Sequence, residues 1–421
     1  MRLCNFDTIS RELIKSAREN GEILSFAVVH RKKESVVMAK LSMSADSKEL
    51  ASAISWVVKS LNMKDDAAHV DLLIDSDGKG VLSHSNQTSY ARSEIQFSDC
   101  DISENGEEIA LDGQFLTKLS SVLAKVSGDV VVSRGTGKNA SALAVKGSNG
   151  LKFSIPIVLG KTPVVPDTVD VATVNEQELF DSLTTYSKLC DSSSSSTPAK
   201  SSVSFVAEDD VITLMATNEF VLGEKKIPAS VVKGDLGTLL IPQESASRFT
   251  AGKDAVDDVT IVYAEKSKSL GYRFADGRLA LYSLTSATPL NYTGMADRIR
   301  AITDKSVSFS SSEMKKSVSV ISQLSWSEAE THVNVDGKRS VMTISDRDGE
   351  NCIDIPINAD GFDGERKIVF YRATLNSALA VPGSANVSLC FSESENGVVV
   401  YELDDDMRRR DDAFVIAMSH K

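Results

Sequence analysis

The chain has 421 residues, and at roughly 100–200 residues per domain this length predicts two to four domains. Hydrophobic residues make up 42% and charged residues 25%, which is typical of a soluble globular protein, and no apolar run reaches the roughly 18 residues of a membrane span. The formal net charge of −13 and the 6% of aromatic residues argue against a protein that coats nucleic acid by bulk charge or base stacking.

Two hydrophobic periods alternate along the chain. Runs with a period of two predict half-buried strands, and stretches with apolar residues three or four apart, as at Phe115, Leu119 and Val122, predict helices. In chain order we predict a helix over 47–61, a strand over 70–74, a helix over 112–126, strands over 130–133 and 152–158, a helix over 175–189, a strand over 211–216, a helix over 242–251, strands over 259–263 and 306–310, a helix over 311–324, strands over 340–344 and 367–370, a helix over 372–381 and a strand over 398–403.

The order of these elements repeats. A strand leads into a helix, three or four strands follow, and the unit recurs six times at spacings of roughly 55–70 residues. Two units make a pseudo-symmetric domain, so we expect an α+β fold of three similar domains, each built from two β-α-β-β-β units. Pro163 and Pro166 mark one boundary and 293–304 another. The predicted parts are an N-terminal extension over 1–36 and domains over 37–162, 168–292 and 303–421.

Local motifs do not indicate catalysis. The five histidines are dispersed, and none pairs with Cys or Glu at metal-ligand spacing. Arg134-Gly-Thr-Gly-Lys138 suggests a phosphate loop, but it lacks the first Gly and the Ser or Thr after the Lys, so a hairpin loop is the better interpretation. The acidic run 404–406 before the basic run 408–410 fits a metal site or a solvated turn, and the turn is favoured. We expect no enzyme, no metal and no cofactor.

The cysteines and the start of the chain bear on the compartment. Five cysteines lie far apart without a CxxC pair, which is typical of reduced thiols in a cytosol. Residues 1–16 carry charges where a signal peptide needs its apolar core. We expect a cytoplasmic protein without a membrane partner.

The predicted helices are comparatively basic, whereas the loops carry most of the acid. An acidic protein with basic helices can hold DNA against those helices and repel it elsewhere. Ordinary amphipathic helices of mixed charge explain the pattern equally well. Lys59 is one such helix cation, and the candidate DNA-facing residues are Lys48, Lys118, Lys125, Lys188, Arg248, Lys253, Lys315, Lys316 and Arg372.

Several segments resemble, in order, the bacterial DNA polymerase III beta subunit. Residues 212–222 (ITLMATNEFVL) resemble a strand and turn of its second domain, and 240–243 (LIPQ) resemble the next strand and helix start. Residues 270–291 resemble the strand, DGR turn and Pro-containing linker that follow, although the family's DGR lies nearer the Pro. Residues 413–421 (AFVIAMSHK) resemble its C-terminal strand and tail. The repeat order matches over 37–421, and order and spacing carry the resemblance.

This resemblance implies a sliding clamp, which is a non-enzymatic processivity factor for DNA replication. Family members are head-to-tail homodimers whose six domains form a ring around duplex DNA, with helices inside and sheets outside. The implied partners are double-stranded DNA without sequence preference, a DNA polymerase, a clamp loader and a second copy of the chain. A β-rich repeat structural or virion protein without a DNA role, and an enzyme with dispersed catalytic residues, remain alternatives.

The resemblance also implies a pocket for partner peptides between domains two and three. The family's basic turn is replaced by Asn218-Glu219-Phe220-Val221, and its Met-Pro-Met by Ala417-Met418-Ser419. These departures suggest a different ligand preference, as in a divergent clamp from a phage or mobile element. Leu222, Val415 and Ile416 can also be plain core residues. The implied pocket residues are Thr217, Phe220, Leu222, Pro289, Ala373, Val415, Ile416 and Met418.

The family's dimer interface joins domain one of one copy to domain three of the other. Phe153 and Leu324 are the matching positions, and each can equally belong to the core of its own domain. Paired edge strands at such an interface close the sheet.

Overall fold

The computed structural model describes residues 41–59, 68–134, 141–160, 162–193, 195–249, 258–301, 305–324, 330–359, 361–392 and 397–419. They all belong to one compact part of the chain, Leu41–Lys421. The predicted extension 1–36 and Lys253 lie outside the described residues, as do residues 135–140 of the candidate phosphate loop.

The first pair of units, here called pair one, follows the predicted order. The chain turns from strand to helix at Asp46, whose carboxylate accepts hydrogen bonds from the backbone N–H groups of Lys48 and Glu49, and Asp112 caps the second helix through the N–H of Phe115. The elements are β1 (Ser42–Asp46), α2 (Ser47–Val58), β2 (His69–Ile74), β3 (Lys79–Ser85), β4 (Ser89–Gln96), β5 (Ser98–Asp101), β6 (Glu107–Asp112), α3 (Gly113–Leu123), β7 (Asp129–Arg134), β8 (Ala142–Gly147) and β9 (Lys152–Val158).

Pair two repeats this order with a shorter second helix. Asn175 caps its first helix through the N–H of Glu178. The elements are β10 (Val169–Asn175), α4 (Glu176–Ser187), β11 (Ser202–Glu208), β12 (Val211–Thr217), β13 (Val221–Val231), β14 (Leu239–Pro242), α5 (Gln243–Ala246), β15 (Asp258–Ala264), β16 (Ser269–Arg273) and β17 (Leu279–Ser283).

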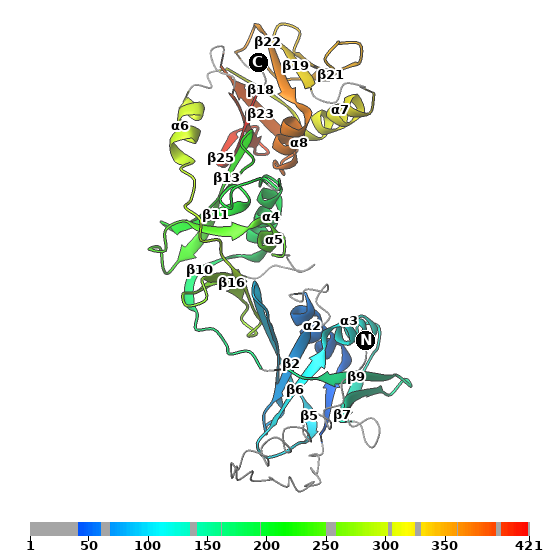
Figure 1. Ribbon diagram of the computed structural model, residues 1–421. Coiled ribbons are helices and arrows are strands. Elements are labelled where there is room, and N and C mark those ends of the chain that lie inside the picture. Colours follow the sequence, from blue (N-terminus) through cyan, green and yellow to red (C-terminus); the bar gives the residue numbers. More distant parts are fainter. Residues whose placement is uncertain are drawn as a thin grey trace, which may run out of the picture. The chain divides into compact units, whose positions relative to one another are not determined.

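Pair three follows a helix, α6 (Thr293–Ala301), that precedes its first strand (Figure 1). Its α7 has the bounds predicted from the sequence. The elements are β18 (Lys305–Ser310), α7 (Ser311–Leu324), β19 (Glu330–Asp336), β20 (Val341–Ser345), β21 (Cys352–Pro356), β22 (Glu365–Tyr371), α8 (Arg372–Ala380), β23 (Asn386–Phe391), β24 (Gly397–Leu403) and β25 (Arg409–Met418). The domain boundaries 37–162, 168–292 and 303–421 remain predictions.

The structure adds one helix that the sequence pattern does not predict and shortens another. The stretch 293–304, expected as a boundary, contains α6, because Tyr292 and Ala296 bury their side chains against strands that only the folded chain brings near. Of the helix expected over 242–251, the described residues, which reach to 249, show only α5 as helical. It begins directly after Pro242, which has no side-chain donor or acceptor to cap it.

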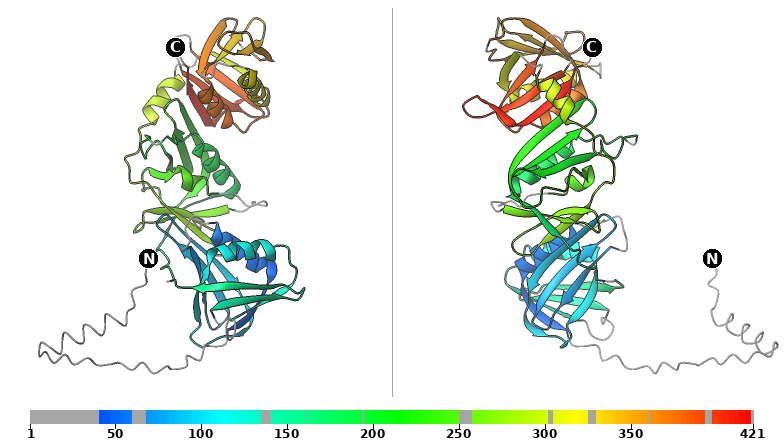
Figure 2. Two further views of the ribbon diagram at one scale, coloured as in Figure 1. Left: turned by 45° about the vertical axis from the view of Figure 1, so that its right-hand side comes forward. Right: turned by 90° about the vertical axis from the view of Figure 1, so that its left-hand side faces the viewer.

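Each unit contributes three strands to a four-stranded antiparallel sheet, and the fourth strand is the one that precedes the helix of the other unit in the pair. The first units give β6-β2-β3-β4, β14-β11-β12-β13 and β22-β19-β20-β21, and the second units give β1-β7-β8-β9, β10-β15-β16-β17 and β18-β23-β24-β25. Gly78 and Gly277 stand in tight turns of these sheets with φ of 80° and 86°, which glycine adopts without steric cost. Figure 2 shows the sheets from two further sides.

Sheets of neighbouring pairs join edge to edge. Strand β4 pairs with β17, where Arg92 lies opposite Leu279, and β13 pairs with β25, where Leu222 lies opposite Ile416. These joins give two continuous eight-stranded sheets. The sheet that ends in β9 and the sheet that ends in β21 have no such neighbour among the described residues.

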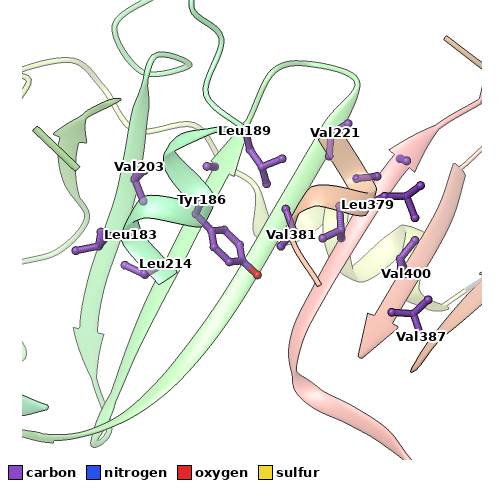
Figure 3. Packing of buried hydrophobic residues seen from close by; sticks show 14 of the residues in the cluster. Leu183, Tyr186, Leu189, Val203, Leu214, Val221, Leu379, Val381, Val387 and Val400 are labelled. Carbon is purple, nitrogen blue, oxygen red and sulfur yellow. The ribbon is translucent and has the colours of Figure 1, made fainter. Parts of the chain in front are cut away.

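The helices pack in twos against these sheets, α2 with α3, α4 with α5 and α7 with α8. One hydrophobic cluster runs through pairs two and three, and a second fills pair one. Figure 3 shows members of the first cluster from both pairs, among them Tyr186 and Leu189 from pair two and Leu379 and Val381 from pair three. Trp56 packs against both clusters.

Candidate functional site

The turn between β12 and β13 holds Phe220 out toward solvent. The hydroxyl of Thr217 donates to the carbonyl oxygen of Val221 at 2.7 Å, and the side-chain oxygen of Asn218 accepts the N–H groups of Phe220 and Val221. Glu219 takes a left-handed backbone conformation with φ of 79°, which is uncommon for a residue other than glycine. The turn is therefore fixed by hydrogen bonds at some cost in backbone strain.

Phe220 meets an aromatic residue of pair three. Its side chain is 48% exposed, and its ring lies edge-on to that of Tyr371, with centroids 6.1 Å apart. Tyr371 is itself exposed and directly precedes α8. The N–H of Met418 donates to the carbonyl oxygen of Phe220 at 2.8 Å, so the turn, α8 and the end of β25 meet at one place.

The joined strands β13 and β25 place the predicted pocket residues on two different faces. Leu222 and Ile416 lie on the face covered by α6, where they pack with Tyr292 and Ala296. Val415 lies on the opposite face, inside the large cluster. Leu222 is 2% exposed. These three side chains are therefore buried at the junction.

The remaining predicted pocket residues are more accessible. Met418 is half-buried against the Leu222 cluster. Pro289 is exposed on the linker before α6, and Ala373 is exposed in the first turn of α8. The surface that the turn offers is thus made by Phe220, Tyr371 and Met418.

Sequence reasoning did not find the α6 residues of this site. Tyr292, Ala296 and Arg300 recur every fourth position, which is helical spacing. Arg300 lies with its guanidinium over the ring of Phe414, 4.7 Å from the centroid. Burial raises the pKa of Tyr292 to about 12, so its hydroxyl is neutral at ordinary pH.

An ion-pair network spans the same junction. Lys225 on β13 is buried, and its ammonium lies 2.5 Å from a carboxylate oxygen of Asp412 on β25 and 3.5 Å from Glu178 on α4. Burial alone would raise the pKa of Asp412, but hydrogen bonds and charges from Arg410 and Lys225 outweigh it and lower this pKa to about 2. Asp412 therefore stays ionised at neutral pH and holds the two strands together.

Eight of the nine predicted DNA-facing cations lie in the described residues, on or directly beside the packed helices. Arg248 donates to Glu244 at 2.6 Å, and Lys315 donates to the carbonyl oxygen of Pro382. Within the described part of the chain, no ion pair engages the other exposed lysines of this set, which are Lys48, Lys118, Lys125, Lys188 and Lys316.

The two predicted interface residues lie near the unjoined sheets. Phe153 is half-buried on β9, and its ring contacts that of Phe115 on α3 edge-on at 6.4 Å. Leu324, the last residue of α7, is 52% exposed. Phe115, Val122 and Val320 are further exposed apolar residues on α3 and α7. An apolar residue on the polar side of an amphipathic helix is the sequence signal for such a surface.

Repeated β-α-β units, sheets joined edge to edge and helices packed in twos define the fold among the described residues. No protein-family model and no curated protein matches the sequence. Solved structures match over nearly the whole chain. The match to the DNA polymerase III subunit beta from Pseudomonas aeruginosa spans 90% of this chain and 99% of that protein, with a TM-score of 0.71 and 14% sequence identity.

Two liganded clamps give similar values. The Pseudomonas aeruginosa sliding clamp bound to griselimycin matches at TM-score 0.73 and 14% identity, covering 91% of this chain and 100% of its own. The Helicobacter pylori beta clamp bound to a DNA ligase peptide matches at TM-score 0.68 and 13% identity, covering 90% and 100%. The chain therefore has the fold of the bacterial DNA polymerase III beta subunit, with a highly divergent sequence.

The described residues contain neither a metal-binding cluster nor a helix suited to a membrane. No group of His, Cys, Asp and Glu there is arranged to hold a metal ion. No described helix combines the length and the apolar composition needed to cross a membrane.

Proposed function

We propose that this chain is a DNA sliding clamp that closes as a head-to-tail homodimer. The observation that carries the proposal is the pair of unjoined sheets. In each existing join, the last strand of a first unit pairs with the last strand of the next pair's second unit, as β4 does with β17 and β13 with β25. The same rule makes β21 of one copy the partner of β9 of another, so that in a two-chain ring each of these two strands would gain the partner that the single chain does not provide.

The exposed apolar residues agree with this closure. At the join of pairs one and two, Trp56 of α2 and Arg248 beside α5 line one recess. The third join would bring α7 to α3 of the second copy. Those two helices carry Val320 and Leu324 on one side and Phe115 and Val122 on the other, all exposed in the single chain.

The helix cations would then face duplex DNA. Contacts from lysine and arginine to phosphates are independent of base sequence and weaken with salt, so they allow sliding while the closed ring prevents release. The proposed partners are double-stranded DNA, a DNA polymerase, a clamp loader and a second copy. The protein would act in the cytoplasm at the nucleoid, or in the host cytoplasm if a phage encodes it.

Partner peptides would dock at the surface made by Phe220, Tyr371 and Met418. The H. pylori clamp was solved with a DNA ligase peptide. Here the turn offers the aromatic ring of Phe220 instead of a basic side chain, and Leu222 is buried. The proposed ligand is therefore a peptide with an aromatic or aliphatic anchor residue.

The DNA contact is tested by charge reversal. Replacing Lys118, Lys125, Lys315 and Lys316 with Glu should abolish salt-dependent binding to duplex DNA while the far-UV spectrum and unfolding midpoint stay unchanged, because all four side chains are exposed. Four reversals at exposed lysines away from these helices, Lys79, Lys226, Lys266 and Lys338, form the matched control. Equal loss in the control, or unchanged binding in the test variant, would contradict the assignment.

A further inference from the structure

A recess lies where pair one meets pair two on the side of the helices. Among its lining residues are two cations from different pairs, Lys59 directly after α2 and Arg248 directly after α5. Three aromatic rings, those of Trp56, Tyr272 and Tyr282, form walls beside them. None of the described lining residues carries a carboxylate. Lys59 lies outside the set of DNA-facing residues predicted from the sequence.

The walls of the recess are held rigidly. The indole N–H of Trp56 donates to the carbonyl oxygen of Leu279, and its ring lies edge-on to Tyr272 and Phe274 with centroids 5.7 and 5.3 Å apart. Arg278 covers the Trp56 ring at 5.0 Å. A site with fixed walls loses little entropy when a ligand binds.

The tyrosines add no negative charge to the recess. The Tyr272 hydroxyl hydrogen-bonds to that of Tyr282, and burial is the main reason that the pKa of each lies above its usual value. Both hydroxyls are therefore neutral at ordinary pH.

The cations keep donors available. Arg248 uses one nitrogen on Glu244, whose side chain is exposed, and a guanidinium has five N–H donors. Lys59 is exposed and makes no ion pair with the residues the structure describes. Two like charges at one recess, in a chain of net charge −13, favour an anion there.

We propose that this recess binds one phosphate of the DNA backbone, with Lys59 and Arg248 donating to the same phosphodiester from two pairs of units. The inference rests on the proposed function, which brings duplex DNA to the helix side. A phosphate fits because it accepts hydrogen bonds from several directions and matches an ammonium and a guanidinium together. Binding there would bridge the junction between pairs one and two.

The test uses Trp56 as a reporter of the recess. The chain has two tryptophans, so Trp326→Phe leaves Trp56 as the single fluorophore. Duplex DNA is titrated at several salt concentrations, with DNA binding followed separately by anisotropy of a labelled duplex. We expect a saturable change in Trp56 fluorescence that parallels the anisotropy.

Variants then count the phosphate contacts. Lys59→Gln and Arg248→Gln should each make the slope of log K against log salt shallower by about 0.9, and the double variant by the same about 0.9, because one phosphate is involved. Lys266→Gln, which removes an exposed lysine paired with Asp167, should leave the slope unchanged. The urea unfolding midpoint of each variant is also measured, because Lys59 at the end of a helix can affect stability. An unchanged midpoint assigns the change in slope to DNA binding.

The outcomes separate this inference from the proposed function. If anisotropy shows normal DNA binding but Trp56 fluorescence does not change, phosphate binding at the recess is overturned and the sliding-clamp proposal stands. The same holds if the salt slopes of both single variants are unchanged. Additive losses in the double variant overturn the shared phosphate. Absence of salt-dependent DNA binding in the wild-type protein overturns both.

Discussion

The indole N–H of Trp56 donates a 3.3 Å hydrogen bond to the backbone carbonyl of Leu279, 223 positions further along the chain. Leu279 also lies opposite Arg92 in the ladder that joins β4 to β17. Pairs one and two are therefore held together twice, by strand pairing at the sheet edge and by a side chain of α2. The sequence around Trp56 predicts neither of these two contacts.

Trp56 should contribute measurably to stability. Trp56→Phe keeps a ring but removes the N–H donor, and we expect a loss of about 1 kcal/mol in the free energy of unfolding. Trp56→Ala also removes the contacts with Tyr272 and Phe274 and should cost roughly 3 kcal/mol. Urea unfolding followed by circular dichroism measures both, and exposed Val164→Ala serves as the control. Wild-type stability in Trp56→Ala would show that the junction does not depend on this side chain.

Gly223 should not tolerate a side chain. A Cβ there would lie 2.5 Å from Cδ1 of Leu189 and 2.9 Å from Cε1 of Tyr186, so α4 would have to move away from β13. We expect Gly223→Ala to lower the free energy of unfolding by about 1–3 kcal/mol. Gly294→Ala is the matched control, because a Cβ at that position of α6 meets nothing within 4 Å. It should be neutral or stabilising by up to about 1 kcal/mol, and equal effects at the two glycines would contradict the packing described for β13.

The Asp412 network should make stability depend on pH in the acid range. Burial would raise the pKa of Asp412, but hydrogen bonds and charges from Arg410 and Lys225 outweigh this effect. They lower the pKa in the folded chain to about 2 from an ordinary value of 3.8. A carboxyl group whose pKa is lowered by folding stabilises the fold at pH values above its pKa in the unfolded chain. This contribution is lost as pH falls from about 4 to about 2.

Asp412→Asn tests that dependence. The variant should lose about 1 kcal/mol at neutral pH, since the partly exposed pair is screened by solvent. The difference in stability between wild type and variant should shrink as pH falls from 4 to 2. A difference that stays constant down to pH 2 would mean that Asp412 is not held ionised by its neighbours.

Phe220 should matter for binding and not for folding. Peptides selected from a displayed library by the wild-type protein should bind Phe220→Ala about tenfold more weakly, which corresponds to losing one aromatic contact. The unfolding midpoint should be unchanged, because the ring is 48% exposed. Exposed Val232→Ala is the control. Unchanged peptide affinity in both Phe220→Ala and Tyr371→Ala would move the peptide site elsewhere.

Much of the fold followed from local patterns, whereas the site depended on contacts between distant segments. The bounds of α7 and β9 were predicted to the residue, because strict helical or alternating periodicity extends to their ends. Helix α6 was missed because Gly294 and its polar residues weaken the pattern. Its burial depends on β24 and β25, which lie about a hundred residues away in the chain.

The predicted pocket residues are divided between two faces of the sheet for a related reason. Val415 and Ile416 are adjacent on one strand, so their side chains point to opposite faces of the sheet. The resemblance matched both to one pocket by position, but strand alternation places only Ile416 beside Leu222. Tyr371, which completes the exposed aromatic pair, comes from a different pair of units and left no local signal.

The mass of the protein in solution, measured by light scattering on a sizing column, tests the central claim most directly. The account predicts the mass of two chains, because two copies can join β9 to β21 twice and so pair both strands that have no partner from a neighbouring pair in the single chain. The mass of a single chain at high protein concentration, or of three or more chains, would contradict a closed ring of six domains.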